Sequence, residues 1–254
     1  MTLPAPQPRH WLPRPTLFYV GSFAVSSYMA ALYVGFVTGL LVAMPVARER
    51  GVDESRFVIA AVILLIPALA GGRLWFLMQW PRNILARGSW RRGQGGAGLY
   101  GGLLLSVLVS PLVLAAAGVS FWPFWDAAAM ILLTGMMITR AGCFMNGCCA
   151  GRATGGPLGL WLPDRAGRWK RRYPTQIFEA LWTAAILGAL LLIRHQLADG
   201  ELFLAGAIAY GAGRVGLEQL RESAANRELS TRINVAASVV IVMLAAGAFV
   251  LRLA

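Results

Sequence analysis

The stretch "MMITRAGCFMNGCCAGRATGGPLGL", Met136 to Leu160, contains the end of an apolar segment and the start of a polar one. Arg140 lies near the end of the apolar part, and all three cysteines of the chain follow between Cys143 and Cys149. A glycine-rich basic segment comes next. This change in composition is typical of a helix that leaves hydrocarbon and reaches the membrane interface.

Apolar runs of similar length recur on both sides of this stretch. Of the 254 residues, 57% are hydrophobic and 13% are charged, and the mean hydropathy is +0.62. A soluble domain averages about 25% charged residues, and a helix needs about 20 apolar residues to cross the hydrocarbon core. We therefore predict an all-α membrane protein, one polytopic domain over residues 1–254. Its seven transmembrane helices are expected at 22–46, 55–79, 98–118, 124–145, 174–194, 201–220 and 232–252.

The net charge of +12 comes almost entirely from arginine, since Lys170 is the only lysine. Such charge can simply anchor helix ends at lipid headgroups. The arginine bias favours a second interpretation, recognition of anionic phosphate, because the planar guanidinium matches phosphate geometry. We expect membrane lipids as partners and no nucleic acid.

Seven spans place the two termini on opposite faces of the membrane. The face of the N-terminus also receives residues 80–97, 146–173 and 221–231, and it carries most of the lysines and arginines. The positive-inside rule alone would make that face cytoplasmic. The N-terminal residues, rich in proline, do not resemble a cleavable signal peptide. With Trp11, Phe18 and Tyr19 they suggest either a loose end or an arm at the interface.

Several polar side chains fall inside or at the ends of the spans. Arg73 and Arg140 lie within spans, where an arginine either faces a polar interior or snorkels to the interface. Tyr210, Arg214 and Glu218 have the i, i+4, i+8 spacing of one helix face, which is equally typical of a solvated helix end.

Two further polar positions lie at the starts of spans. Tyr100 stands among glycines that could form a cavity wall or a frayed helix start. Gln176 and Glu179 lie one turn apart in "YPTQIFEALW", and a buried Glu179 would need a partner such as arginine.

The three cysteines, Cys143, Cys148 and Cys149, allow several interpretations. Zinc needs about four ligands, and the two histidines, His10 and His195, lie in remote segments, so we expect no metal ion. Adjacent cysteines would form a strained disulfide, whereas Cys143 could pair with either. The cysteines could also be small packing residues, or one of them could be a reactive thiol activated by a nearby arginine.

The segments "YMAALYVGFVTGLL", "GGRLWFLMQWPRNILARG", "GAGLYGGLL", "RAGCFMNGCCAGRAT", "YPTQIFEALW" and "YGAGRVGLEQLRE", taken in order, resemble the prolipoprotein diacylglyceryl transferase family. The resemblance implies seven helices, a small extramembrane head at 146–173 between helices 4 and 5, and a cavity open to lipid. It also implies the bacterial inner membrane, with the N-terminus and the head extracytoplasmic.

This resemblance implies transfer of a diacylglyceryl group from phosphatidylglycerol to the lipobox cysteine of a prolipoprotein, without a cofactor. Arg140 and Arg214 fall on the arginines that are essential in the family, and Tyr100 falls on the position of its histidine base. Where the family has asparagine and glutamate, this chain has Cys143 and Cys148. The implied substrate-binding residues are Tyr28, Arg73, Asn146, Gly151, Arg152, Tyr210 and Glu218.

Two further functions stay open on the sequence. One is a divergent transferase that delivers a lipid group to another acceptor, with Cys148 or Cys149 taking part. The second is a membrane protein that binds a related anionic phospholipid without catalysis.

Overall fold

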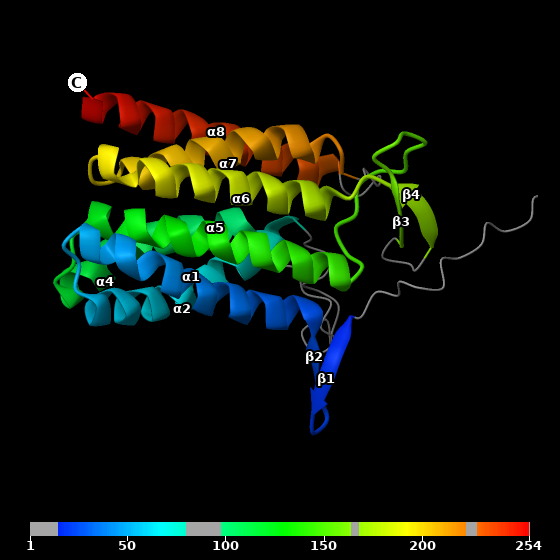
Figure 1. Ribbon diagram of the computed structural model, residues 1–254, viewed down its shortest axis with the longest axis horizontal. Coiled ribbons are helices and arrows are strands. Elements are labelled where there is room, and N and C mark those ends of the chain that lie inside the picture. Colours follow the sequence, from blue (N-terminus) through cyan, green and yellow to red (C-terminus); the bar gives the residue numbers. More distant parts are fainter. Residues whose placement is uncertain (1–14, 80–97, 164–167, 222–227, 254) are drawn as a thin grey trace, which may run out of the picture.

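The computed structural model describes residues 15–79, 98–163, 168–221 and 228–253. In these ranges the chain forms seven α-helices and two short antiparallel hairpins (Figure 1). The helices are α1 (Ser27–Glu49), α2 (Glu54–Gln79), α4 (Leu99–Ala117), α5 (Phe121–Met145), α6 (Thr175–Ile193), α7 (Glu201–Glu218) and α8 (Glu228–Leu253). The strands are β1 (Thr16–Val20), β2 (Phe23–Ser26), β3 (Leu160–Pro163) and β4 (Trp169–Arg172).

Six of the described helices are long and apolar enough to cross a membrane. The exception is α7, which has 18 residues and carries Glu201, Arg214 and Glu218. The chain is therefore a multi-pass membrane protein, as predicted. Length and composition support six of the seven predicted spans, and α7 forms a helix at the sixth predicted position.

The first predicted span begins too early. Residues 23–26 form β2, which pairs with β1, and α1 begins only at Ser27. The Ser26 side chain accepts a hydrogen bond from the backbone N–H of Met29 at 3.1 Å, which is the usual role of a serine N-cap. This cap, rather than hydropathy, sets the start of α1. Phe18 and Tyr19 of the predicted arm lie exposed on β1, whereas Trp11 and residues 80–97 lie outside the described residues.

Small residues let the helices approach closely. A Cβ atom on Gly39 of α1 would lie 2.9 Å from the Ile131 Cα of α5. On Gly142 it would lie 2.9 Å from the Ser27 carbonyl oxygen and 3.4 Å from the Tyr28 Cα. Close packing of small residues is a common way to associate helices in lipid, where hydrocarbon competes equally for apolar side chains. It places Tyr28 directly against the end of α5.

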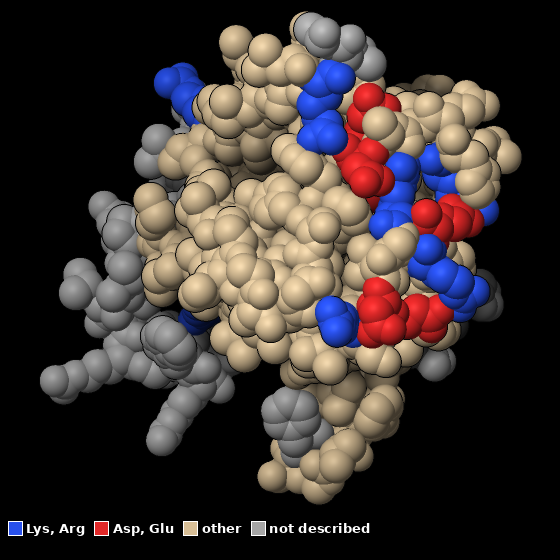
Figure 2. Space-filling view, turned by 90° about the vertical axis from the view of Figure 1, so that its left-hand side faces the viewer, with Lys and Arg blue, Asp and Glu red and all other residues tan. Residues whose placement is uncertain are grey.

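The two ends of the helical bundle differ. Both hairpins lie beyond the same end, and α8 ends at the opposite one (Figure 1). At that opposite end, basic and acidic side chains alternate along one side of the surface (Figure 2). They include the pair of Arg194 Nε with Glu49 Oε2 at 2.9 Å and that of Arg50 Nη1 with Asp199 Oδ1 at 3.2 Å.

Candidate active site

A buried carboxylate joins three helices near the end that carries the hairpins. Glu179, in the second turn of α6, is 3% exposed. Its Oε1 accepts hydrogen bonds from Arg140 Nη2 of α5 at 2.6 Å and from the Tyr210 hydroxyl of α7 at 2.8 Å. Its Oε2 accepts one from Arg214 Nη1 of α7 at 2.8 Å. The expectation that Glu179 needs an arginine is confirmed, and the structure supplies two.

A second carboxylate extends this group along α7. Arg214 Nη2 lies 2.8 Å from Glu218 Oε2, one turn further on, and Arg221 Nη1 lies 3.6 Å from the same oxygen. Both side chains of the closer pair are largely buried, so they do not form a solvated helix end. We call these residues the arginine–glutamate cluster: Arg140, Glu179, Tyr210, Arg214, Glu218 and Arg221.

The cluster suits an anion. Its three guanidinium groups outnumber its two carboxylates by one positive charge. Arg140 Nε is buried and makes no hydrogen bond within the described residues. Arg140 also points inward to Glu179 with its side chain 14% exposed, which does not fit snorkelling. Ion pairs hold both arginines in fixed directions, and charge-assisted hydrogen bonds of this kind favour phosphate or carboxylate ligands.

The three cysteines lie together beside this cluster. Their Sγ atoms are within 4.8 Å of one another, and all three are free thiols. Cys143 Sγ lies 4.0 Å from Arg140 Nη1. Hydrogen bonds from the Cys143 and Cys148 thiols hold the pKa of Cys149 well below its usual range. Among the interpretations that the sequence leaves open, the disulfide is not formed here, whereas close packing and a reactive thiol both agree with this arrangement.

Tyr100 has a different partner. It lies in the first turn of α4, 7% exposed, and its hydroxyl group shares a hydrogen bond with Ser238 Oγ of α8. The Trp75 ring of α2 meets the Tyr100 ring edge-on, with the centroids 6.2 Å apart. Sequence reasoning did not single out Ser238, because a lone serine in an apolar helix carries no distinctive pattern.

Gly151 and Asn146 have backbone roles in the structure. A Cβ atom on Gly151 would lie 2.6 Å from the Leu220 carbonyl oxygen and 2.8 Å from that of Tyr173. Only glycine therefore fits where the chain passes between the start of α6 and the end of α7. Asn146 is the C-cap of α5, and its backbone N–H donates to the Gly142 carbonyl at 2.8 Å.

Two predicted arginines lie outside the arginine–glutamate cluster. The Arg73 guanidinium of α2 lies over the Phe76 ring, 5.5 Å from its centroid. Exposed Arg152 lies over the Tyr173 ring at 5.9 Å. Conversely, Glu179 and Arg221 belong to the cluster although they were not among the predicted site residues. The sequence did carry a signal for Glu179, because a carboxylate at the start of an apolar helix needs a cationic partner.

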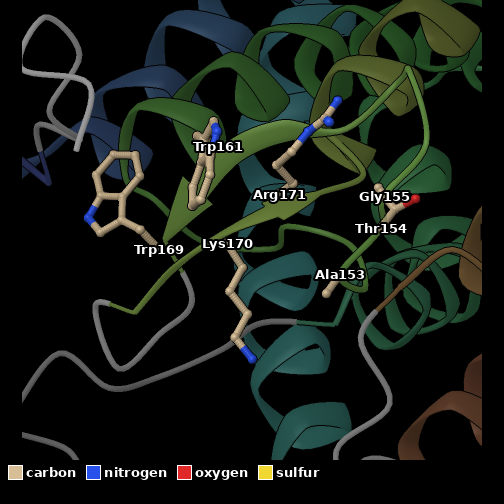
Figure 3. Close-up of a pocket in the computed structure, with 7 residues that line it drawn as sticks. All are labelled: Ala153, Thr154, Gly155, Trp161, Trp169, Lys170 and Arg171. Atoms are coloured by element: carbon tan, nitrogen blue, oxygen red, sulfur yellow. The ribbon is translucent and has the colours of Figure 1, made fainter. Parts of the chain in front are cut away.

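A shallow groove of about 460 Å³ lies on the β3–β4 hairpin and the preceding loop. Figure 3 shows the Trp161 and Trp169 indoles side by side, with Arg171 on the same face of the hairpin and Lys170 pointing the opposite way. The strand register explains this, because Trp161 pairs with Arg171 and Pro163 with Trp169. Aromatic and basic side chains together are typical of a membrane interface.

The helices and the buried cluster define a class: a multi-pass membrane protein whose transmembrane helices hold an arginine–carboxylate site near one end. A site of this kind fits an anionic lipid headgroup better than an apolar ligand.

Comparison with known proteins makes the class specific. The family model described as prolipoprotein diacylglyceryl transferase matches residues 15–252, so the chain belongs to that family. It is 31% identical over 255 residues to the phosphatidylglycerol–prolipoprotein diacylglyceryl transferase of Bacillus licheniformis, with 94% of this chain and 92% of the relative covered. The enzyme of the same name from Gloeobacter violaceus is 29% identical, with 82% of each chain covered. The one from Corynebacterium diphtheriae is 26% identical, with 93% and 92% covered.

Proposed function

We propose that this protein transfers the diacylglyceryl group of phosphatidylglycerol to the lipobox cysteine thiol of a prolipoprotein signal peptide. Membership of the family supports the reaction, since the relatives carry that activity in their names. The convergence of Arg140 and Arg214 on Glu179 is the observation that carries the assignment of the site.

The reaction needs a group that stabilises the leaving phosphate. The acceptor thiolate attacks the glyceryl carbon that carries the phosphate ester, a carbon–sulfur bond forms, and the carbon–oxygen bond to phosphorus breaks. The electron pair leaves with glycerol 1-phosphate, and the thiol proton passes to solvent. In this proposal Arg140 and Arg214 bind that phosphate and neutralise the charge that builds on it, while Glu179 fixes their directions.

Removal of the proton from the acceptor thiol is less demanding than stabilisation of the leaving phosphate. A free thiol has a pKa of about 8.5, so a few per cent is thiolate near neutral pH. Nearby guanidinium groups increase that fraction. Tyr100 stands where the family has histidine, and in this proposal its ring and hydroxyl position the lipid headgroup rather than remove the proton.

The setting of the reaction is also part of the proposal. The chain is taken as one domain with seven spans in the bacterial inner membrane, with its N-terminus and the 146–173 head on the extracytoplasmic face. In support, the hairpins and the arginine–glutamate cluster lie toward the same end of the helices. The site would then meet acceptors after their export.

A second candidate is a divergent transferase with another acceptor. The observation that favours it is the thiol group formed by Cys143, Cys148 and Cys149 beside Arg140, where the family has polar residues. Under this second function a Cys148→Ser variant loses turnover while the fold is kept. Under the main proposal the variant keeps turnover.

The deciding experiment combines purified full-length protein, phosphatidylglycerol vesicles and a synthetic lipobox peptide, with mass spectrometry of the peptide. We expect the mass of one diacylglyceryl group to appear on the peptide, and none when the lipobox cysteine is replaced by serine. If the protein binds phosphatidylglycerol but leaves every lipobox peptide unmodified, the prolipoprotein function is wrong and lipid recognition alone remains.

A further inference from the structure

Three sulfur atoms in one small volume form a potential ligand set of their own. Cys143 lies in the last helical turn of α5, and Cys148 and Cys149 lie in the turn that follows. All three Sγ atoms lie within 4.8 Å of one another, and no disulfide joins them. Three sulfurs at this separation need only small side-chain movements to reach a common ion.

The backbone that carries these thiols is held by the start of α6. The Cys148 N–H donates to the Cys143 carbonyl at 3.1 Å. Gln176 Nε2 donates to the Cys148 carbonyl at 2.6 Å, and Thr175 Oγ1 donates to that of Cys149 at 2.7 Å. The turn is therefore fixed before any ligand arrives, which reduces the cost of binding.

Cys149 has a backbone conformation that few side chains adopt. Its φ is 65°, in the left-handed region where glycine is usual. Residues held in such conformations persist when their surroundings determine them, and they gather at functional sites. The hydrogen bonds from Gln176 and Thr175 to the Cys148 and Cys149 carbonyls hold this conformation. In it, the Cys149 thiol lies close to the thiols of Cys143 and Cys148.

The kind and number of ligands point to a soft ion. No imidazole or carboxylate joins the three thiols within the described residues. A structural zinc site takes four ligands, which is why the sequence alone argued against zinc. Thiolate ligands select soft ions, of which Cu(I) is one. Arg140, 4.0 Å from Cys143 Sγ, would partly compensate the negative charge of three thiolates around a monovalent ion.

We propose that Cys143, Cys148 and Cys149 form a three-thiolate binding site for a soft monovalent metal ion, with Cu(I) as the ion that fits. Binding exchanges three thiol protons for one Cu(I), which is supplied in that oxidation state, so no electron is transferred. This proposal does not rest on the proposed transferase reaction, although Arg140 contacts both sites, and its test uses binding rather than activity.

The experiment titrates reduced full-length protein in detergent micelles with Cu(I) under anaerobic conditions, against a chromophoric Cu(I) chelator. We expect one Cu(I) per chain and a sulfur-only first shell in X-ray absorption spectra. Each single Cys→Ser variant should bind at least about 100-fold more weakly, since loss of even an indirect partner of a metal ligand costs 10–100-fold. Ala150→Ser is the matched control, because it adds a hydroxyl group in the same turn and keeps all three thiols.

Four outcomes overturn the proposal. The triple Cys→Ser variant is decisive if it folds, as judged by gel filtration and thermal unfolding, and still binds Cu(I) with unchanged affinity. Tighter binding of Zn²⁺ than of Cu(I) would contradict a monovalent site. Thiol counting provides a measurement that needs no variant: if added Cu(I) leaves all three thiols as reactive as before, or if two prove to be a disulfide that reductant does not open, the site does not exist.

Discussion

At the scale of single residues, Glu179 decides how the site is organised. One carboxylate accepts hydrogen bonds from Arg140, Tyr210 and Arg214, which come from two different helices. The two oxygens of this buried carboxylate define where both guanidinium groups point, because charge-assisted hydrogen bonds have a preferred geometry. Glu179 is therefore a positioning residue for both arginines.

Replacing either arginine by lysine should remove most of the activity. Arg140→Lys and Arg214→Lys keep the charge but lose the planar, forked donor that binds two oxygens at once. We expect at least about a 100-fold loss in the peptide modification rate, the size typical of a lost oxyanion donor. Arg194→Lys, which alters a pair with Glu49 at the opposite end of the helices, is the control and should keep full activity. Equal activity in all three variants would exclude a phosphate role for the cluster.

Glu179→Gln tests positioning separately from charge. Glutamine keeps the shape of the side chain but puts an NH₂ group opposite a guanidinium donor, so one arginine loses its acceptor. We expect a fall in kcat with little change in KM for phosphatidylglycerol, because the surplus positive charge still attracts the lipid. If KM rises and kcat is unchanged, Glu179 acts on lipid binding and the positioning role is wrong.

Tyr100 should tolerate substitution better than the arginines. Its hydroxyl group shares a hydrogen bond with Ser238, whereas it is Tyr210 that donates to Glu179. Tyr100→Phe therefore loses one neutral hydrogen bond, about 1 kcal/mol. We expect a rate reduction of less than about tenfold, and Tyr100→His should be tolerated or improve the rate. Abolished turnover in Tyr100→Phe that high pH does not relieve would show that Tyr100 performs proton chemistry.

At the scale of helices, a side chain from a distant segment fixes the start of α7. Asp126 of α5 is fully buried, and its two oxygens accept the backbone N–H groups of Gly200 at 2.8 Å and Phe203 at 3.0 Å. Arg50 Nε lies 3.4 Å from Oδ2. The first backbone N–H groups of a helix have no acceptor within that helix, and here the Asp126 carboxylate of α5 is the acceptor. This contact sets the position of α7, which carries Arg214.

Asp126→Asn should therefore lower stability. The amide nitrogen of asparagine would face donors, so a buried backbone N–H would lose its acceptor, and Arg50 would lose one of the two carboxylates that it faces. We expect a loss of about 3 kcal/mol, as for one partner removed from a buried pair, seen as a lower Tm in detergent. Asp199→Asn changes the half-exposed partner of the same arginine and should cost less than about 1 kcal/mol. Equal Tm values for both variants would show that the cap contributes nothing.

At the scale of the whole molecule, sidedness is the property that connects structure to function. Both hairpins lie beyond one end of the helices, while the loop from α6 to α7 lies at the opposite end. The proposed acceptor has been exported, so the hairpin end should face outward. Among the described residues, arginines are more numerous toward that end, which opposes the positive-inside rule; under the proposed function, phosphate binding by Arg140 and Arg214 would account for part of this excess.

Labelling in intact cells tests the orientation. In a background with all three cysteines replaced by serine, Leu158→Cys and Ala198→Cys place single exposed thiols at opposite ends. We expect a membrane-impermeant maleimide to label Leu158→Cys before lysis and Ala198→Cys only afterwards. The reverse pattern would mean that the hairpin end faces the cytoplasm and that the proposed access of exported acceptors is wrong.

The sequence by itself determined the class of fold and the chemical character of the site. Long apolar runs identify spanning helices because hydrophobic burial depends on local composition. Within a helix, the spacing of Arg214 and Glu218 was enough to predict a shared face, and their ion pair follows from it. The sequence also predicted that a buried Glu179 needs a cation, because an unpaired carboxylate is costly to bury.

Only the tertiary structure decided which distant groups meet. Tyr100 and Ser238 are 138 residues apart, and Arg140 and Glu179 are 39 apart. Such pairs depend on how close two helices lie and how they are rotated, and small residues such as Gly39 and Gly142 control that. The meeting of three thiols in a turn held by α6 depends in the same way on hydrogen bonds between segments, whereas the serine cap at the start of α1 is a local hydrogen bond between Ser26 and Met29. Hydropathy carries no information about those bonds.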